Sequence, residues 1–327
     1  MTKRPLAVLA ITLTLWAATI ASAKENVVVR FNGANGGSPL GTLVSDGKGN
    51  FFGTSLNGGK KNCTSCPGLV FEVSSNGTVT VIHAFSGSDG LGPNGTLIRD
   101  GNGNLYGTTA GGGASQEGVA FELSPQGNGT WTETVLHSFG GGQDGVVPHG
   151  AIALDSQGNL YGTTNGGGTN NQGTVYQLTP QGNGTWSETI LHSFGAAGDR
   201  GLPLGGVTLD SHGNIFGTSH GGGANSVGEV YQLVPKGNGQ WTENIIYSFT
   251  GSLDGGVPMT PVTLDASGNV YGSTQNGGNK FRYGGTVFKL SPGSSGSWTF
   301  NLLHAFGGGT DGYDPSAVAF DGVGNLY

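Results

Sequence analysis

A short motif recurs six times in this chain of 327 residues: glycine and asparagine, an aliphatic residue or phenylalanine, and then tyrosine or phenylalanine. Successive copies are separated by 54, 55, 55, 55 and 56 residues. A period this regular indicates one structural unit copied along the chain. Most recurring residues are therefore expected to build each copy, and residues that depart from the repeat are the better candidates for function. The asparagines of the motif are Asn50, Asn104, Asn159, Asn214, Asn269 and Asn325.

Each copy has the pattern of four short antiparallel strands, which the third copy illustrates. Residues 151–154 are an apolar strand, and residues 155–159 are a turn in which aspartate, glycine and asparagine favour the turn backbone. Residues 160–164, 173–178 and 185–194 are the second, third and fourth strands. Four strands in one repeat of this length are typical of a β-propeller blade.

The sequence therefore predicts an all-β fold, a β-propeller repeat domain spanning residues 24–327 with four-stranded blades of about 55 residues. Residues 26–31 are predicted to be the last strand of a blade, because Phe31 aligns with the phenylalanines that end the later copies. The final copy breaks off inside its second strand, so a truncated ring is expected. Five complete blades are predicted at residues 41–85, 95–139, 150–194, 205–249 and 260–306, with a partial sixth at 316–327.

The first 23 residues have the pattern of a signal peptide. Lys3 and Arg4 precede an apolar run, and Ala21-Ser22-Ala23 supplies the small residues of a cleavage site. Cleavage would remove two of the 13 basic residues and none of the 20 acidic ones, which leaves a net charge of −9. We expect an exported chain with no transmembrane span and no affinity for nucleic acid.

The combined motifs resemble a known family. Asp-x-x-Gly-Asn-Leu-Tyr-Gly-Thr-Thr, a glycine pair, Gly-Thr-Val-Tyr-x-Leu and Leu-His-Ser-Phe follow one another in the third copy, and the other complete copies carry variants of them. Together they resemble the GloVer (Gloeo/Verruco) tandem repeat of exported bacterial proteins, over essentially the whole mature chain. The resemblance implies a secreted or surface-anchored repeat protein without an established activity. A looser likeness is to kelch propellers, because Gly167-Gly168, Tyr176 and Trp186 follow the second strand at similar offsets.

Histidines recur in one register of the fourth strand, at His83, His137, His192 and His304. Imidazole can serve as a base or a ligand, but Tyr247 and Val29 occupy the same register in other copies. Alternation along a strand would also place His137 on one face with Val135 and Phe139. The pattern favours a packing role over a ligand role.

Aspartates recur in the loop that leads from one blade to the next, and four of the five precede glycine. Five carboxylates on one face would suit Ca²⁺ or a polyol, but Asp-Gly is also an ordinary turn pair, and the turn interpretation is favoured. These aspartates are Asp89, Asp144, Asp199, Asp254 and Asp311.

The copies differ most on the side of the blades that carries these aspartate loops. Strand alternation puts the glycine-rich loop between the second and third strands on the same side, and both loops vary between copies. Variable loops on a repeated frame are a common place for binding. The position before the first strand varies too, as Asn94, His149, Leu204 and Met259.

Cys63 and Cys66 are the only cysteines. In an exported chain we expect them to form a local disulfide that closes the glycine-rich loop of the first copy, because a single CxxC supplies only half of a zinc site.

These features predict a non-catalytic exported scaffold that binds a glycan or a cell-surface protein through the loops of one face. The chain contains no G-x-S-x-G, H-E-x-x-H or phosphate-loop motif, and no cofactor is expected. The alternative is an extracellular polysaccharide hydrolase or lyase with an Asp/His site at the mouth of the channel, in which His149 or His220 would meet a carboxylate. A second alternative is a purely structural envelope component.

Overall fold

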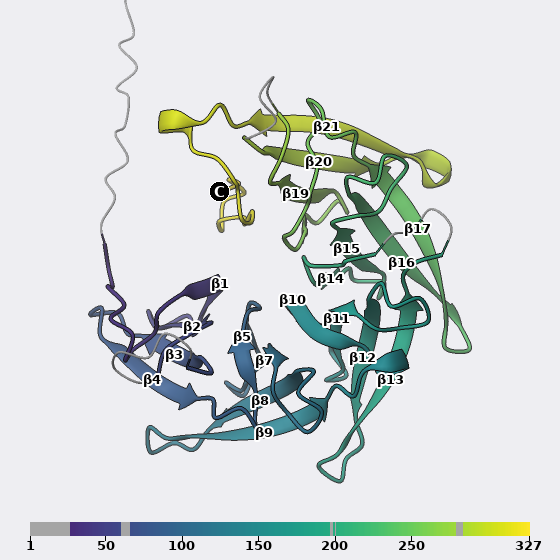
Figure 1. Cartoon of the computed structure of the whole chain (residues 1–327). Helices are drawn as coiled ribbons and strands as arrows, with labels where there is room; N and C mark the ends of the chain where they lie inside the picture. The colour runs from purple at the N-terminus through teal and green to yellow at the C-terminus, as the bar shows by residue number, and fades with distance from the viewer. Residues whose placement is uncertain (1–26, 60–65, 197–198, 200, 279–283) are drawn as a thin grey trace, which may run out of the picture.

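The computed structural model describes residues 27–59, 66–196, 199, 201–278 and 284–327. The predicted signal peptide, residues 1–23, lies outside this part of the chain. Figure 1 shows five β-sheets side by side around a common axis, with the first and fifth at the two ends of the arc. The prediction of an all-β propeller with four-stranded blades is confirmed. Regular helical structure in the described part consists of three short 3-10 turns, Gly142–Asp144, Ser294–Gly296 and Gly309–Asp311.

The blades follow one another in chain order. The first contains β1 (Pro39–Ser45), β2 (Phe51–Ser55), β3 (Leu69–Val73) and β4 (Val79–Ala84). The second contains β5 (Leu91–Pro93), β6 (Ile98–Arg99), β7 (Leu105–Gly111), β8 (Val119–Pro125) and β9 (Trp131–Ser138). The third contains β10 (Val146–Leu154), β11 (Leu160–Gly166), β12 (Thr174–Pro180) and β13 (Trp186–Ser193). The fourth contains β14 (Val207–Leu209), β15 (Ile215–Ser219), β16 (Glu229–Gly237) and β17 (Gln240–Ser248), and the fifth β18 (Thr263–Leu264), β19 (Val270–Thr274), β20 (Thr286–Pro292) and β21 (Trp298–Ala305).

Each blade is an antiparallel meander in which strands that are neighbours in sequence are neighbours in the sheet. The first strand of a blade lies innermost and the fourth lies at the rim (Figure 1). In the second blade the innermost position is shared by β5 and β6, which both pair with β7. The inner strands therefore surround the axis, and the fourth strands of adjacent blades lie beside one another at the periphery.

The recurring Asp-x-x-Gly-Asn turn closes the hairpin between the first two strands. In the third blade, Asp155 accepts hydrogen bonds from the backbone N–H groups of Gln157 and Asn159, and from the side chains of Asn159 and Tyr161. The carboxylate thus satisfies donors that the tight turn leaves without a strand partner. The Gly-Asn-Leu-Tyr motif is a structural element of each blade.

The glycine after the motif tyrosine or phenylalanine is required by close packing. A Cβ atom at Gly162 would lie 2.3 Å from the hydroxyl oxygen of Tyr176, and one at Gly217 would lie at the same distance from that of Tyr231. These aromatic side chains of the third strand cross over the second strand and are fully buried.

A phenylalanine just after the fourth strand joins each of the first four blades to the next one. Phe194 is fully buried and meets Tyr231 of the next blade edge to face, with ring centroids 5.2 Å apart. Aromatic pairs of this geometry add about 0.5–1.5 kcal/mol to the stabilisation from burial. The equivalent pairs are Phe85–Phe121, Phe139–Tyr176 and Phe249–Phe288.

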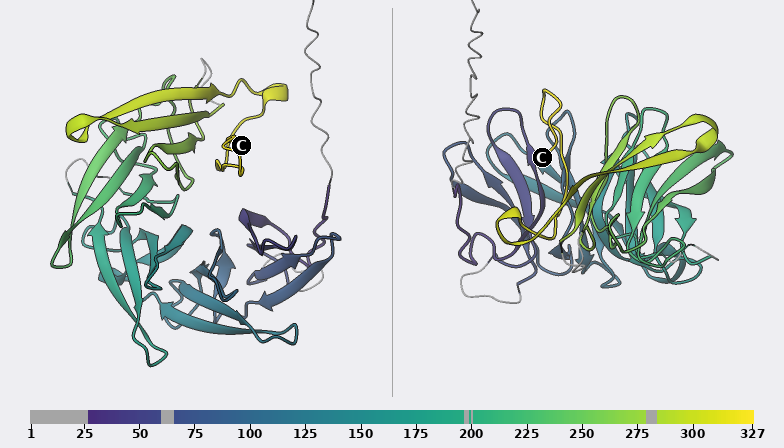
Figure 2. Two further views of the ribbon diagram at one scale, coloured as in Figure 1. Left: turned by 180° about the vertical axis from the view of Figure 1, so that it is seen from behind. Right: turned by 90° about the horizontal axis from the view of Figure 1, so that it is seen from above.

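The N-terminal segment takes the same position against the first blade. Phe31 meets Phe71 edge to face at 5.0 Å, which confirms the predicted correspondence of Phe31 with the later phenylalanines. After β21 the chain turns back toward the middle of the ring, where Phe320 and Leu326 form a β-bridge (Figures 1 and 2). No helix among the described residues is long and apolar enough to cross a membrane.

Candidate functional site

The two kinds of variable loop lie on the same side of the blades, as predicted. In the third blade the N–H of Gly168, in the glycine-rich loop, donates to the carbonyl of Gly142, in the aspartate loop, at 2.8 Å. The equivalent bond in the second blade joins Gly113 to Gly87 at 3.0 Å. The Asp-x-x-Gly-Asn turns lie at the opposite ends of the strands.

The recurring histidines and the recurring loop aspartates, which the sequence presented as two separate sets, are partners. The Nε2 atom of His137 lies 2.8 Å from Asp144 Oδ1, and that of His192 lies 2.9 Å from Asp199 Oδ2. The histidines do pack on neighbouring phenylalanines, as predicted, but the pairing with the aspartates was not predicted. The remaining pairs are His83–Asp89 at 3.3 Å, His304–Asp311 at 3.1 Å and, with tyrosine in place of histidine, Tyr247–Asp254 at 3.0 Å.

A β-bulge in the fourth strand explains the orientation of these histidines. In the second blade His137 pairs with Ala120 but Val135 pairs with Phe121, so Leu136 is an inserted residue. The bulge places His137 on the side of the third blade and Val135 on the side of the first. The expectation that His137 and Val135 share one face is wrong for this reason, although His137 and Phe139 do pack together, at 4.8 Å.

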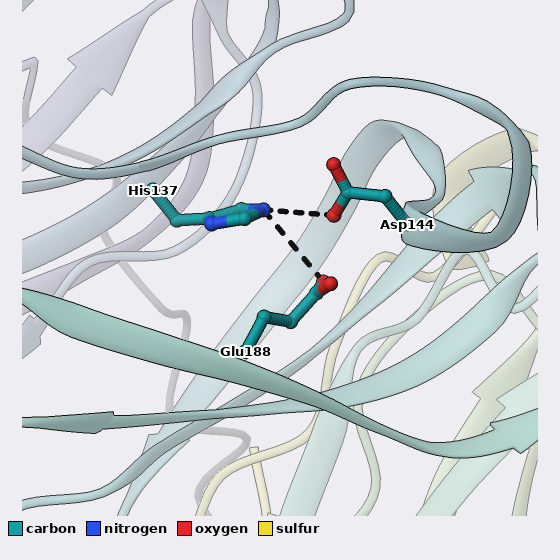
Figure 3. Close-up of side chains that lie close together, drawn as sticks. All are labelled: His137, Asp144 and Glu188. Carbon is teal, nitrogen blue, oxygen red and sulfur yellow. Dashed lines mark hydrogen bonds and ion pairs between the residues drawn. The ribbon is translucent and has the colours of Figure 1, made fainter.

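A glutamate from the next blade completes two of these clusters. Glu188 of β13 lies 3.8 Å from His137 Nε2, and Figure 3 shows its carboxylate beside that of Asp144. At the next interface Glu243 of β17 lies 3.7 Å from His192 Nε2. In each cluster the three ligand-type atoms lie within 4.8 Å of one another. The clusters join a fourth strand and its following loop to the fourth strand of the neighbouring blade.

Burial and mutual repulsion set the protonation of the clusters. Burial, together with the hydrogen bond and charge of Asp144, raises the pKa of Glu188 to about 9. Burial also opposes ionisation of Asp144, but bonds from Glu188, His137 and the N–H of Gly140 outweigh it and hold the pKa of Asp144 below its usual range. Near neutral pH these opposed shifts favour a protonated Glu188 beside an ionised Asp144.

The other two interfaces of this type follow the same pattern. Burial and the charge of Asp89 raise the pKa of Glu133 to about 7. Burial and the charge of Asp199 likewise raise the pKa of Glu243 to about 7, although His192 acts in the opposite direction. For His192, burial is outweighed by the bond to Asp199 and by the charge of Glu243, so its pKa is raised.

The interface between the fourth and fifth blades replaces the cluster with aromatic side chains. Tyr247 stands at the histidine position and Phe300 at the glutamate position, and their rings stack with centroids 4.5 Å apart and an interplanar angle of 16°. The hydroxyl group of Tyr247 still donates to Asp254. The two replacements occur together.

A second candidate site is the central channel, which has a volume of about 1020 Å³. None of the described residues that line it is an aspartate, glutamate, lysine or arginine. His149 lies in the lining, and its Nδ1 atom is 2.9 Å from the carbonyl oxygen of Leu204. Since a carbonyl only accepts, Nδ1 carries the proton. The repeat-equivalent lining residues are Leu40, Asn94, His149, Leu204 and Met259.

This arrangement of repeats identifies the family. The model of the Gloeobacter/Verrucomicrobia repeat matches residues 13–203 and 128–327, which together cover nearly the whole chain. The chain belongs to the Gloeobacter/Verrucomicrobia repeat family. No match to a curated protein was found.

Solved structures similar to this member of the repeat family share its fold at low sequence identity. One is a gluconolactonase from Xanthomonas campestris, with a TM-score of 0.51, 13% identity, and coverage of 88% of this chain and 80% of that one. Another is PorZ, a surface component of the type-IX secretion system of Porphyromonas gingivalis, with a TM-score of 0.53 and 15% identity over 86% of this chain and 36% of that one. At such identities the similarity establishes the propeller fold alone.

The structure places the remaining predicted residues as follows. Within the described residues, no three loop aspartates lie close enough together to share an ion. His220 donates its backbone N–H to Leu202, and its Nδ1 atom is buried without a hydrogen-bond partner in the described structure. No carboxylate of the described residues lies within ion-pair distance of His149 or His220. Cys66 is buried, whereas Cys63, the other half of the predicted disulfide, lies outside the described residues.

Sequence reasoning missed Glu133, Glu188 and Glu243. The available signal was their recurrence in one register of three successive copies, together with the change of the histidine position to Tyr247 in the fourth copy and of the glutamate position to Phe300 in the fifth. Their partners lie on the preceding blade, and the period alone does not show which residues of neighbouring copies meet.

Proposed function

We propose that this protein is an exported, non-catalytic scaffold that binds a glycan or a protein partner through the loop-bearing face and the adjoining mouth of the channel. One observation carries the proposal. Five repeat-equivalent positions line the channel where the inner strands leave the loop face, and four different residue types occupy them. Variation at such positions on a constant frame is typical of a binding surface.

The chemistry of the channel favours an uncharged ligand. Its lining combines aliphatic side chains with hydroxyl, amide and imidazole groups, and no charged side chain of the part of the chain that the structure describes lies there to pair with an ionic ligand. A charged ligand would lose its hydration there without compensation, whereas a neutral sugar or an uncharged peptide segment would not. With Nδ1 of His149 donating to Leu204, its Nε2 atom can accept a hydrogen bond from a ligand hydroxyl group.

Binding to a glycan array tests this proposal, with a panel of cell-surface proteins as the second arm. We expect saturable binding to a neutral ligand by the native chain. The double substitution Asn94→Leu and His149→Leu, which copies the residue at Leu204, should weaken that binding at least about tenfold, since it removes two hydrogen-bonding side chains. Gln157→Ala, on the exposed turn at the opposite face, is the matched control and should bind normally. Absence of any saturable ligand would instead favour a purely structural envelope component.

One observation supports the alternative of a polysaccharide hydrolase or lyase. At one site Glu188 carries a proton and Asp144 is ionised. Glycoside hydrolases use such a pair of carboxyl groups, one as the general acid and one as the base or nucleophile. The pair lies between fourth strands at the rim, however, and no aspartate or glutamate of the described segments lines the channel. Release of reducing ends from a panel of polysaccharides, abolished by Glu188→Gln, would establish the enzyme and overturn the scaffold.

A further inference from the structure

Glu229 breaks the repeat at the interface between the third and fourth blades. The equivalent positions of the other blades hold Leu69, Val119, Thr174 and Thr286. Thr174 is satisfied by a 2.8 Å hydrogen bond to Thr164, but Glu229 is fully buried and neither of its carboxylate oxygens has a hydrogen-bond partner within the described structure. A buried carboxyl group without a partner is costly, so its presence calls for a compensating group.

Glu229 faces the cluster formed by His192, Asp199 and Glu243. It stands two residues before Tyr231 in β16, and Tyr231 packs on Phe194 of the third blade. Since alternate residues of a strand share a face, Glu229 also points toward the third blade. Burial raises the pKa of Glu229 to about 8, and the charges of Glu243 and Asp199 act in the same direction, whereas the nearby backbone N–H of Gly223 acts in the opposite one.

The cluster itself has unused ligand atoms. Asp199 is 4% exposed, and its Oδ1 atom has no partner in the described structure. The Oε1 atom of Glu243 likewise has no hydrogen-bond partner in the described structure. Three carboxyl groups and one imidazole therefore converge on one interface with four buried oxygens unpaired, of which two belong to Glu229. Such a cluster of buried carboxyl groups would be stabilised by an additional positive charge.

We propose that this interface binds one divalent transition-metal ion, with His192 and Asp199 of the third blade and Glu243 of the fourth as ligands and Glu229 as a supporting carboxylate. One imidazole nitrogen with carboxylate oxygens suits Zn²⁺ or Mn²⁺ better than Ca²⁺ or Mg²⁺, which prefer oxygen alone. The ligand atoms lie within 4.8 Å of one another, and bond lengths near 2.1 Å require them to approach to about 3.3 Å. The ion would join two blades at the rim, away from the channel.

Binding at the rim is independent of the ligand proposed for the loop face, so either proposal can fail without the other.

The chain itself supplies matched variants for the test. His192→Tyr with Glu243→Phe installs the pair that stacks between the fourth and fifth blades, and His137→Tyr with Glu188→Phe makes the same change one interface earlier. Native protein stripped with chelator and titrated with Zn²⁺ and then with Mn²⁺ in a calorimeter should bind with a Kd on the order of 1 µM or tighter. The first variant should lose one ion per chain and the second should retain it.

Glu229→Thr keeps all three ligands and restores the residue of the third and fifth blades. It should weaken Zn²⁺ binding about tenfold, as loss of a supporting group does, and its far-ultraviolet circular dichroism should match that of the native chain. Co²⁺ substitution provides a second readout through its visible absorption bands. No binding by the native chain, equal binding by the His192→Tyr/Glu243→Phe variant, or loss of the ion in the His137→Tyr/Glu188→Phe variant would each overturn the proposal.

Discussion

The interface between the third and fourth blades and the interface between the fourth and fifth are built on the same frame with opposite chemistry. Both have an edge-to-face aromatic pair at their centre, Phe194–Tyr231 in one and Phe249–Phe288 in the other. Next to that pair, the first has a His–Asp–Glu cluster and the second a stacked Tyr247–Phe300 pair. A blade interface thus has a constant apolar part and an interchangeable outer part.

The comparison shows that the outer positions of the interface change as a pair. A glutamate opposite a tyrosine would be a buried acid without a histidine, and a phenylalanine opposite a histidine would leave the imidazole with one carboxylate fewer. Pairwise exchange avoids both costs.

The largest expected effect tests whether the apolar part is in fact shared. Phe194→Ala and Phe249→Ala should each lower the free energy of unfolding by about 3–5 kcal/mol, because both side chains are fully buried and their removal leaves a cavity. Urea denaturation followed by tryptophan fluorescence measures the two losses. A difference of more than about 1.5 kcal/mol between them would mean that the outer chemistry changes the core as well.

The next largest effect is expected when only one residue of the outer pair is exchanged. Phe300→Glu should cost about 2 kcal/mol, since it places a carboxyl group against Tyr247 with no histidine nearby. Adding Tyr247→His should recover about 1 kcal/mol of that loss. The measurement is a double-mutant cycle of unfolding free energies, with Asp254 unchanged, and additive effects would disprove the paired exchange.

The pH dependence of stability should differ between the two interfaces. In the folded chain Glu229 and Glu243 hold protons up to pKa values of about 8 and 7, whereas the unfolded chain releases them near pH 4.5. Their contribution is complete below pH 4.5 and is lost as the pH rises through 7 to 8, and the raised pKa of His192 acts in the same direction.

Stability should therefore fall between pH 5 and pH 8 when a chelator is present. Glu229→Thr should reduce this fall by about 1–2 kcal/mol, whereas Thr286→Val, at the equivalent position of the fifth blade, should leave it unchanged. Denaturant midpoints at the two pH values give the comparison, and an unaltered slope in Glu229→Thr would count against the assigned protonation.

The smallest effect concerns the turns on the opposite side of the blades. Asp265 in the fifth blade accepts a hydrogen bond from Tyr271 at 3.0 Å, whereas the fourth blade has Phe216 in that place. Tyr271→Phe should cost about 0.5–1 kcal/mol, the value of one half-buried hydrogen bond. Thermal denaturation resolves the change, and Phe216→Tyr offers the reciprocal gain.

Much of the fold was predictable because its causes are local. The period, the four strands and the turn depend on residues that lie next to each other, such as Asp155 and Asn159. The equivalence of Phe31 with Phe194 followed from register alone and is confirmed by its edge-to-face contact. The bulge at Leu136 was not predictable, because the pattern of one strand does not show an inserted residue. It becomes evident only from the pairing of the flanking residues with Ala120 and Phe121 of the neighbouring strand.

The sequence by itself determined the blade: its strands, its turn and the glycines that admit an aromatic ring, all of which act within one repeat. Only the tertiary structure decided which residues of different repeats meet. His192 and Asp199 are seven residues apart, but Glu243 lies 51 residues beyond His192, and the three come together because adjacent fourth strands lie side by side at the rim. The charge of a carboxyl group depends on the groups around it, so the protonation of Glu229 is decided only when the blades pack together.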